Sequence, residues 1–184
     1  MAARRMEDMS LTKLTLLVVG RLCIVFHSLP AWRAGWKHAG ARSLAFLAIL
    51  PLLLLNFETW VLRRFEARQV LSWVLLMTSV GLALPEFVVL RRHGHPQGNI
   101  DFTTPLVTAG VYRFLRHPLY ASLICLAWGT LLKRVVPSTI ILAAAATLPL
   151  YATAKLEEAF NFPKFGPPYA DDVRRTKMFV PLLI

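Results

Sequence analysis

The sequence predicts an all-α fold that crosses a membrane several times. The chain has 184 residues, of which 56% are hydrophobic, and its mean hydropathy is +0.53. Apolar residues make up about half of an ordinary soluble domain, so this chain is more apolar than that class. Its apolar residues also gather in long runs between short polar segments. These observations predict a polytopic membrane protein with about five transmembrane helices and a structured cytosolic C-terminal tail.

Four apolar runs approach the roughly 20 residues that a helix needs to cross the hydrocarbon core. They cover residues 11–29, 43–62, 70–90 and 135–154. A fifth run, 119–132, is shorter and reaches a usable length only if the polar residues just before it also lie at membrane depth. Prolines inside these runs are compatible with membrane helices, because neighbouring helices can satisfy the freed carbonyls.

Two polar segments flank the last pair of runs. The connection before the short run is rich in Gly, Pro, Asn and Thr, which favours a structured loop, and the tail after the last run is basic and aromatic. Because two helices separate the loop from the tail, we expect both on one face of the membrane, where they can meet. We therefore divide the chain into three N-terminal helices, residues 1–90, and a single unit of loop, two helices and tail, residues 91–184.

The net charge of +11 does not by itself indicate nucleic acid as a partner. The basic residues form short clusters beside the apolar runs, where they anchor membrane helices and set topology. Lys and Arg are in excess on the side of the loop and tail, which favours a cytosolic location for both. His93 and His95 form an HxH pair in a glycine-rich loop without another obvious ligand, so we predict solvated histidines and no metal site.

The start of the short run, GVYRFLRHPLY, carries candidate binding residues. Pro118 suits the first turn of a helix, because its missing N–H would have no partner there. The free amides of that turn and the helix dipole attract a carboxylate or phosphate, and Arg116 and His117 flank this position. Tyr112 and Tyr120 add aromatic faces that can stack on a base or hold a cation.

Two carboxylates, Glu157 and Glu158, follow the last apolar run directly. Ionisable groups at the membrane boundary are costly and usually functional. Successive residues of a helix point about 100° apart, so we expect only Glu157 to face the loop, while Glu158 faces water or Lys155. Each residue alone could be an interfacial anchor, but the combination fits a ligand with an aromatic ring, a carboxylate and positive charge. S-adenosylmethionine has all three.

The same residues carry a resemblance to known enzymes. The segment TPLVTAGVYRFLRHPLY, followed by LEE, FGPPY and FVPLL, resembles the isoprenylcysteine carboxyl methyltransferase and phospholipid methyltransferase families over roughly residues 90–184. The resemblance implies a helical membrane enzyme whose cofactor, S-adenosyl-L-methionine, is enclosed by the last helices, the loop and the tail. It also implies a lipophilic acceptor, a small molecule or lipid-modified group, that arrives from the membrane lipids.

Matched position by position, the resemblance implies a set of cofactor contacts: Thr104, Pro105, Leu106, Val107, Tyr112, His117, Pro118, Leu119, Tyr120 and Glu157. Arg116 and Glu158 are the candidate catalytic residues. One position departs from the prenylcysteine-type enzymes, which carry an arginine one turn before the first glutamate where this chain has Thr153. Lys155 or Arg116 could supply that charge, and a neutral or different lipophilic acceptor is equally consistent.

The expected reaction is an in-line methyl transfer from S-adenosylmethionine, in which alignment matters more than acid or base catalysis. Two alternatives stay open. Sterol reductases that use NADPH share a similar RHP.Y region, but they are usually longer and carry further dinucleotide-contacting segments that are not found here. A non-catalytic membrane protein could keep the same fold. The sequence does not indicate the oligomeric state.

Overall fold

The structure, a computed structural model, describes residues 11–33, 37–60, 66–93 and 106–179. Within these ranges every regular element is helical, which confirms the predicted all-α fold. The α-helices are α1 (Leu11–Arg33), α2 (Lys37–Asn56), α3 (Ala67–His93), α4 (Pro118–Lys133), α5 (Pro137–Phe165) and α6 (Pro167–Arg175). Two short 3-10 helices are also present. One, η2 (Phe57–Thr59), follows α2, and the other, η3 (Gly110–Arg113), precedes α4.

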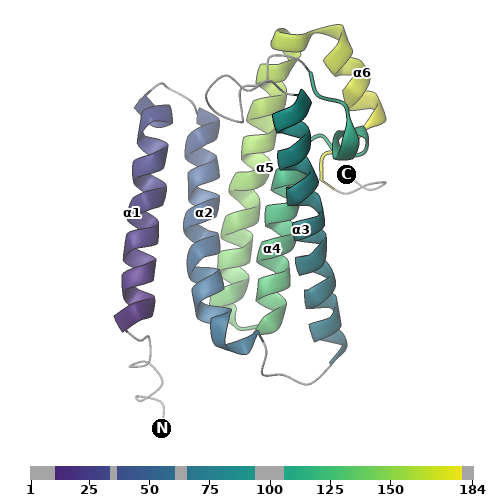
Figure 1. The fold of residues 1–184 in the computed structure, drawn as a ribbon. Coiled ribbons are helices and arrows are strands. Elements are labelled where there is room, and N and C mark those ends of the chain that lie inside the picture. Colours follow the sequence, from purple (N-terminus) through teal and green to yellow (C-terminus); the bar gives the residue numbers. More distant parts are fainter. Residues whose placement is uncertain (1–10, 34–36, 61–65, 94–105, 180–184) are drawn as a thin grey trace.

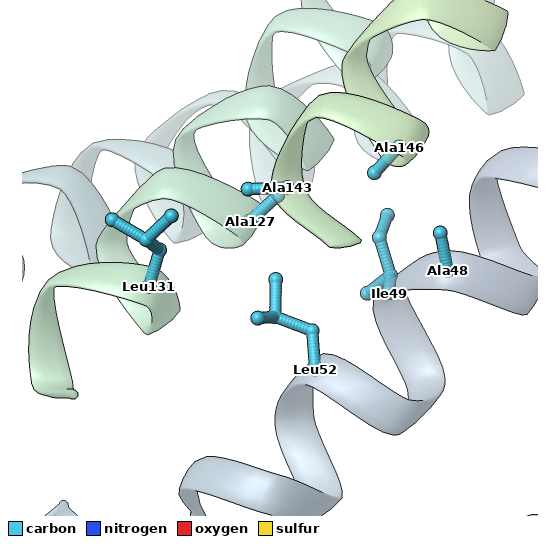
Figure 2. Packing of buried hydrophobic residues seen from close by; sticks show 7 residues of the cluster. All are labelled: Ala48, Ile49, Leu52, Ala127, Leu131, Ala143 and Ala146. Carbon is cyan, nitrogen blue, oxygen red and sulfur yellow. The ribbon is translucent and has the colours of Figure 1, made fainter. Parts of the chain in front are cut away.

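Helices α1 to α5 lie side by side, and α6 lies at the end of the bundle where α4 begins and α5 finishes (Figure 1). Helix α3 packs on α4, and α2 packs on both α5 and α1. The centre of the bundle is built from small and branched side chains: Ala48, Ile49, Leu52, Ala127, Leu131, Ala143 and Ala146 (Figure 2). Alanine at these contacts allows helix backbones to approach closely, as in membrane bundles.

Three helical stretches in the described residues are long and apolar enough to cross a membrane: Gly40–Thr59, Ala67–Arg92 and Pro137–Phe165. Helix α1 has 23 residues, and α4 is the shorter apolar helix with 16 residues. The outward faces carry large apolar side chains, such as Phe26 and Leu148, which are 77% and 69% exposed. Such faces are expected to contact lipid. The prediction of an all-α membrane protein is confirmed.

Helix α5 extends further than the apolar pattern suggested. The apolar run ends near residue 154, but the helix continues to Phe165, so Glu157 and Glu158 lie inside a helix, as the 100° argument assumed. Gly166, with φ 61°, then ends α5, and its N–H donates to the carbonyl of Phe162 at 3.0 Å. Positive φ is readily available only to glycine.

The loop before α4 and the segment after α6 meet through backbone hydrogen bonds. The N–H of Arg116 donates to the carbonyl of Lys177 at 2.8 Å, and the N–H of Lys177 donates to the carbonyl of Phe114 at 3.0 Å. The N–H of His117 donates to the carbonyl of Met178 at 3.3 Å. The predicted meeting of loop and tail is therefore confirmed. It brings both segments to one end of the bundle (Figure 1).

Candidate active site

Arg116 joins three segments at this end of the bundle. Its Nε donates to Oε1 of Glu158 at 2.8 Å, and the two side chains are only 11% and 9% exposed. Its Nη1 donates to the carbonyl of Val173 at 3.2 Å and to the carbonyl of Thr176. Hydrogen bonds between ionised partners are about twice as strong as neutral ones. The side chain thus fixes the loop against α5 and the end of α6.

His117 lies between the two glutamates of α5. Its Nδ1 is 3.6 Å from Oε2 of Glu157, and its Nε2 is 3.8 Å from Oε1 of Glu158. These distances are too long for good hydrogen bonds, so the attraction is electrostatic and requires the protonated ring. Burial alone would lower the pKa of His117, but the two carboxylates outweigh it, and the pKa is raised above its usual value of 6.5.

Both glutamates face the loop, so the prediction that only Glu157 does so is wrong. Glu158 contacts Lys155 through Oε2 at 3.3 Å, as expected, but its Oε1 also accepts the hydrogen bond from Arg116. The whole residue is 7% exposed. Arg116 of the loop contacts Glu158, and the first turn of α4 contacts Glu157.

Tyr120 connects the first turn of α4 directly to α5. Its Oη donates to Oε1 of Glu157. Its ring stacks on that of His117, with 5.6 Å between centroids and 14° between planes. Tyr120 is 5% exposed and packs with Leu150 and Ala154 in the second apolar cluster of the bundle. The predicted approach of the start of α4 to Glu157 is therefore confirmed.

Sequence reasoning missed a third carboxylate, Glu86 of α3. The Oη of Tyr112 donates to Oε1 of Glu86 at 2.6 Å, and Glu86 is 5% exposed. Burial raises the pKa of the Tyr112 phenol, and the nearby carboxylate of Glu86 raises it further. The available signal was a single acidic residue inside an otherwise apolar run, because a carboxylate at such a position is costly unless it has partners.

The remaining candidate residues occupy the loop and the start of α4. Val107 and Pro118 are buried, whereas Leu106 and Leu119 are half-buried. Thr104 and Pro105 lie outside the described residues, as do His95 and the side chain of His93. Thr153 is fully buried, and its Oγ1 donates to the carbonyl of Pro149 at 2.8 Å. It contributes no charge to the site.

The site can attract a ligand that carries both signs of charge. Glu86, Glu157 and Glu158 provide negative charge from α3 and α5, while Arg116 and His117 provide positive charge from the loop. The tyrosine rings add faces that attract cations and stack on planar rings. Within the part of the chain that the structure describes, no group of three His, Cys, Asp or Glu residues could hold a metal ion.

The sequence profile of the phospholipid methyltransferase family matches residues 67–166, which is more than half of the chain. The match begins at the first residue of α3 and ends just after α5, so it includes all three carboxylates, Arg116 and His117. No curated protein and no solved structure matches the chain.

Proposed function

The chain belongs to the phospholipid methyltransferase family, and on that premise we propose that it transfers a methyl group from S-adenosylmethionine to a lipophilic acceptor in the membrane. The family makes the protein a membrane methyltransferase of this general kind. The observation that carries the finer proposal is the contact of Tyr120 and His117 with Glu157, where the loop, α4 and α5 meet. Buried charges and aromatic rings converge there at the end of an apolar bundle.

The proposed donor fits the charges of this site. S-adenosylmethionine carries a sulfonium and an ammonium group, which carboxylates such as Glu157 attract. It also carries a carboxylate, which the protonated ring of His117 suits. Its adenine can stack on a tyrosine ring, and the sulfonium can lie over one. We propose the following donor contacts in the described residues: Leu106, Val107, Tyr112, His117, Pro118, Leu119, Tyr120 and Glu157, with Thr104 and Pro105 added from the sequence.

The work of the protein in this reaction is alignment. A bound sulfonium supplies an activated methyl group, which an acceptor lone pair attacks in line while the sulfur keeps the bonding electrons. No strong acid is required for that step. Tyr120 and Glu157 would hold the donor at the start of α4, and the bundle would present the acceptor and exclude water. Such alignment can lower a barrier by about 7–11 kcal/mol.

For Arg116 and Glu158, which we predicted as catalytic residues, the geometry supports a positioning role. Arg116 uses its guanidinium on Glu158 and on the carbonyls of Val173 and Thr176. We propose that the pair closes the loop and the tail over the donor. Lys155 remains the cation that could meet a charged acceptor, since Thr153 is neutral and the side chain of Lys155 is 51% exposed.

We propose that the site faces the cytosol. The excess of Lys and Arg on the side of the loop and tail supports this orientation, since such residues favour the cytosolic side of a membrane. The polar donor would then arrive from water, and the lipophilic acceptor would arrive from the bilayer beside α4 and α5.

The test is incubation of the purified, detergent-solubilised chain with S-adenosylmethionine labelled in the methyl group and a total lipid extract. The proposal expects label in a lipophilic product and less of it with Glu157→Gln. A parallel titration with NADPH addresses the reductase alternative. Binding of NADPH in place of S-adenosylmethionine, or of neither, would overturn the proposal.

A further inference from the structure

Glu86 is a buried carboxylate that the proposed donor contacts do not include. It lies on α3 directly after Pro85, inside the stretch Ala67–Arg92 that is apolar enough to cross a membrane. The hydrogen bond that it accepts from Tyr112 is 2.6 Å long, the length expected when an O–H donates to an ionised carboxylate. Keeping a carboxylate in such a helix is costly, so its partner in the loop calls for a functional explanation.

The backbone of the loop approaches α3 closely next to this carboxylate. Gly110 has φ +62°, and a Cβ added there would lie 2.7 Å from Cγ2 of Val89. Val89 is three residues after Glu86, so the two side chains lie on neighbouring turns of one face of α3. Gly110 and Tyr112 therefore hold η3 against α3 at two adjacent points, the first by close approach and the second by a hydrogen bond.

Tyr112 is also one of the donor contacts proposed above. Burial and the carboxylate of Glu86 raise the pKa of its phenol, and the negative charge of Glu157 raises it further. One tyrosine thereby links the carboxylate of α3 to the carboxylate that we propose for donor binding.

We propose that Glu86 is a positioning residue of the methyl donor site, which acts by holding the phenol of Tyr112 and so fixing its ring where the donor binds. This inference rests on the proposed function. Helix α3 then contributes to the site through its acidic residue, in addition to packing against α4. Two substitutions at position 86 separate the charge from the hydrogen bond. Glutamine keeps the acceptor oxygen without the charge, whereas leucine removes both.

The experiment measures S-adenosylmethionine affinity and thermal unfolding of the full chain in detergent for Glu86→Gln, Glu86→Leu, Tyr112→Phe and the Glu86→Leu/Tyr112→Phe double variant. Because the bond would fix the ring that contacts the donor, we expect affinity to fall about 10- to 100-fold in Glu86→Leu and in Tyr112→Phe. Glu86→Gln should lose less. The double variant should bind about as weakly as the weaker single variant, because both substitutions remove one interaction.

Gln69→Leu is the matched control on the same helix. Gln69 is 4% exposed, and its Oε1 accepts a hydrogen bond from Nζ of Lys133 at 3.2 Å, near the other end of α3. Its loss should lower the unfolding temperature without changing donor affinity. A role of Glu86 in stability alone would make Glu86→Leu behave like Gln69→Leu.

Several outcomes would overturn the inference. Wild-type affinity in Glu86→Leu, or in Tyr112→Phe if the leucine variant does not fold, would remove Glu86 from the donor site. Additive losses in the double variant would show that the two residues act independently. If the wild-type chain binds the donor and Glu157→Gln weakens it while Glu86→Leu does not, only this inference fails. If the wild-type chain does not bind the donor, the proposed function fails as well.

Discussion

Nε of Arg116 lies 2.8 Å from Oε1 of Glu158, which joins the loop before α4 to α5 across 42 positions of sequence. The same guanidinium donates to two carbonyls near the end of α6. A single side chain thus ties the three segments that surround the proposed donor site. Because both side chains are about nine-tenths buried, solvent screens this ion pair much less than a pair at the surface.

Arg116→Ala should destabilise the protein strongly while leaving its insertion into the membrane intact. Removing one partner of a buried ion pair costs about 3–5 kcal/mol when the remaining charge is uncompensated. Lys155 still contacts Glu158 at 3.3 Å, so we expect a loss toward the lower end of that range. The free energy of unfolding in detergent measures this loss, and faster proteolysis of the tail should accompany it. Arg174→Ala is the control, since Arg174 is 81% exposed and lies 3.7 Å from Asp171. Equal stability of the two variants would contradict the conclusion that Arg116 fixes the loop against α5 and the end of α6.

The raised pKa of His117 predicts how stability changes with pH. The folded protein binds the proton more tightly than the unfolded chain, so the contribution is fully present below pH 6.5, the ordinary histidine value, and is lost as the pH rises through the folded pKa. The wild-type unfolding temperature should therefore fall more between about pH 6 and about pH 9 than that of His117→Gln. Parallel curves for the two proteins would show that His117 does not gain a proton on folding.

Gly110→Ala should weaken the attachment of the loop to α3. A side chain at φ +62° is strained, and the added methyl would meet Val89 at 2.7 Å. The strain alone costs about 1–2 kcal/mol, and the contact with Val89 adds to it. Val89→Ala in the same chain should recover part of the loss, because it removes the contact but not the strain. Unfolding in detergent measures both effects.

Gly81→Ala is the control for this substitution. Gly81 lies inside α3, and a Cβ there would meet nothing within 4 Å. Alanine is favoured over glycine in a helix interior by about 1 kcal/mol, so this variant should be as stable as the wild type or more stable. If both alanine variants behave alike, the close approach of Gly110 to Val89 does not determine the position of the loop.

Tyr120→Phe should weaken donor binding more than it weakens the fold. The substitution keeps the ring that stacks on His117 but removes the O–H that donates to Glu157. The Glu157 carboxylate then lacks the partner that orients it toward the donor, so we expect donor affinity to fall at least about tenfold. Trp128→Phe, which removes a bond to the exposed side of α5 at Thr147, should leave donor affinity unchanged. An equal loss in both variants would contradict a specific role for Tyr120.

Much of the bundle could be predicted from the sequence, because membrane helices are recognisable there as long apolar runs. The start of α4 at Pro118 was predictable from a property of proline itself, since it lacks an N–H and has a fixed φ. The meeting of loop and tail followed from counting spans. The first prediction depends on local chemistry, and the second depends on the even number of helices between the loop and the tail. Neither requires knowledge of side-chain contacts.

The contacts between segments were less predictable. Beyond the apolar run, α5 carries Glu158, whose partner Arg116 lies 42 positions away. Which groups Glu157 and Glu158 contact depends on where the loop and α4 lie against α5, and a 100° helical step alone does not determine this. Glu86 was missed because its partner, Tyr112, lies in a loop whose path is set by Gly110. In each case tertiary packing decided what the local pattern left open.

The most direct test of the central claim is an equilibrium titration of the purified full chain with S-adenosylmethionine, carried out side by side on the wild type, Glu157→Gln and Gln69→Leu. The claim is that the start of α4 and the acidic part of α5 together bind one donor. It predicts saturable binding by the wild type and by Gln69→Leu, and affinity at least about tenfold weaker in Glu157→Gln. No binding by the wild type, or equal affinity in all three proteins, would contradict it.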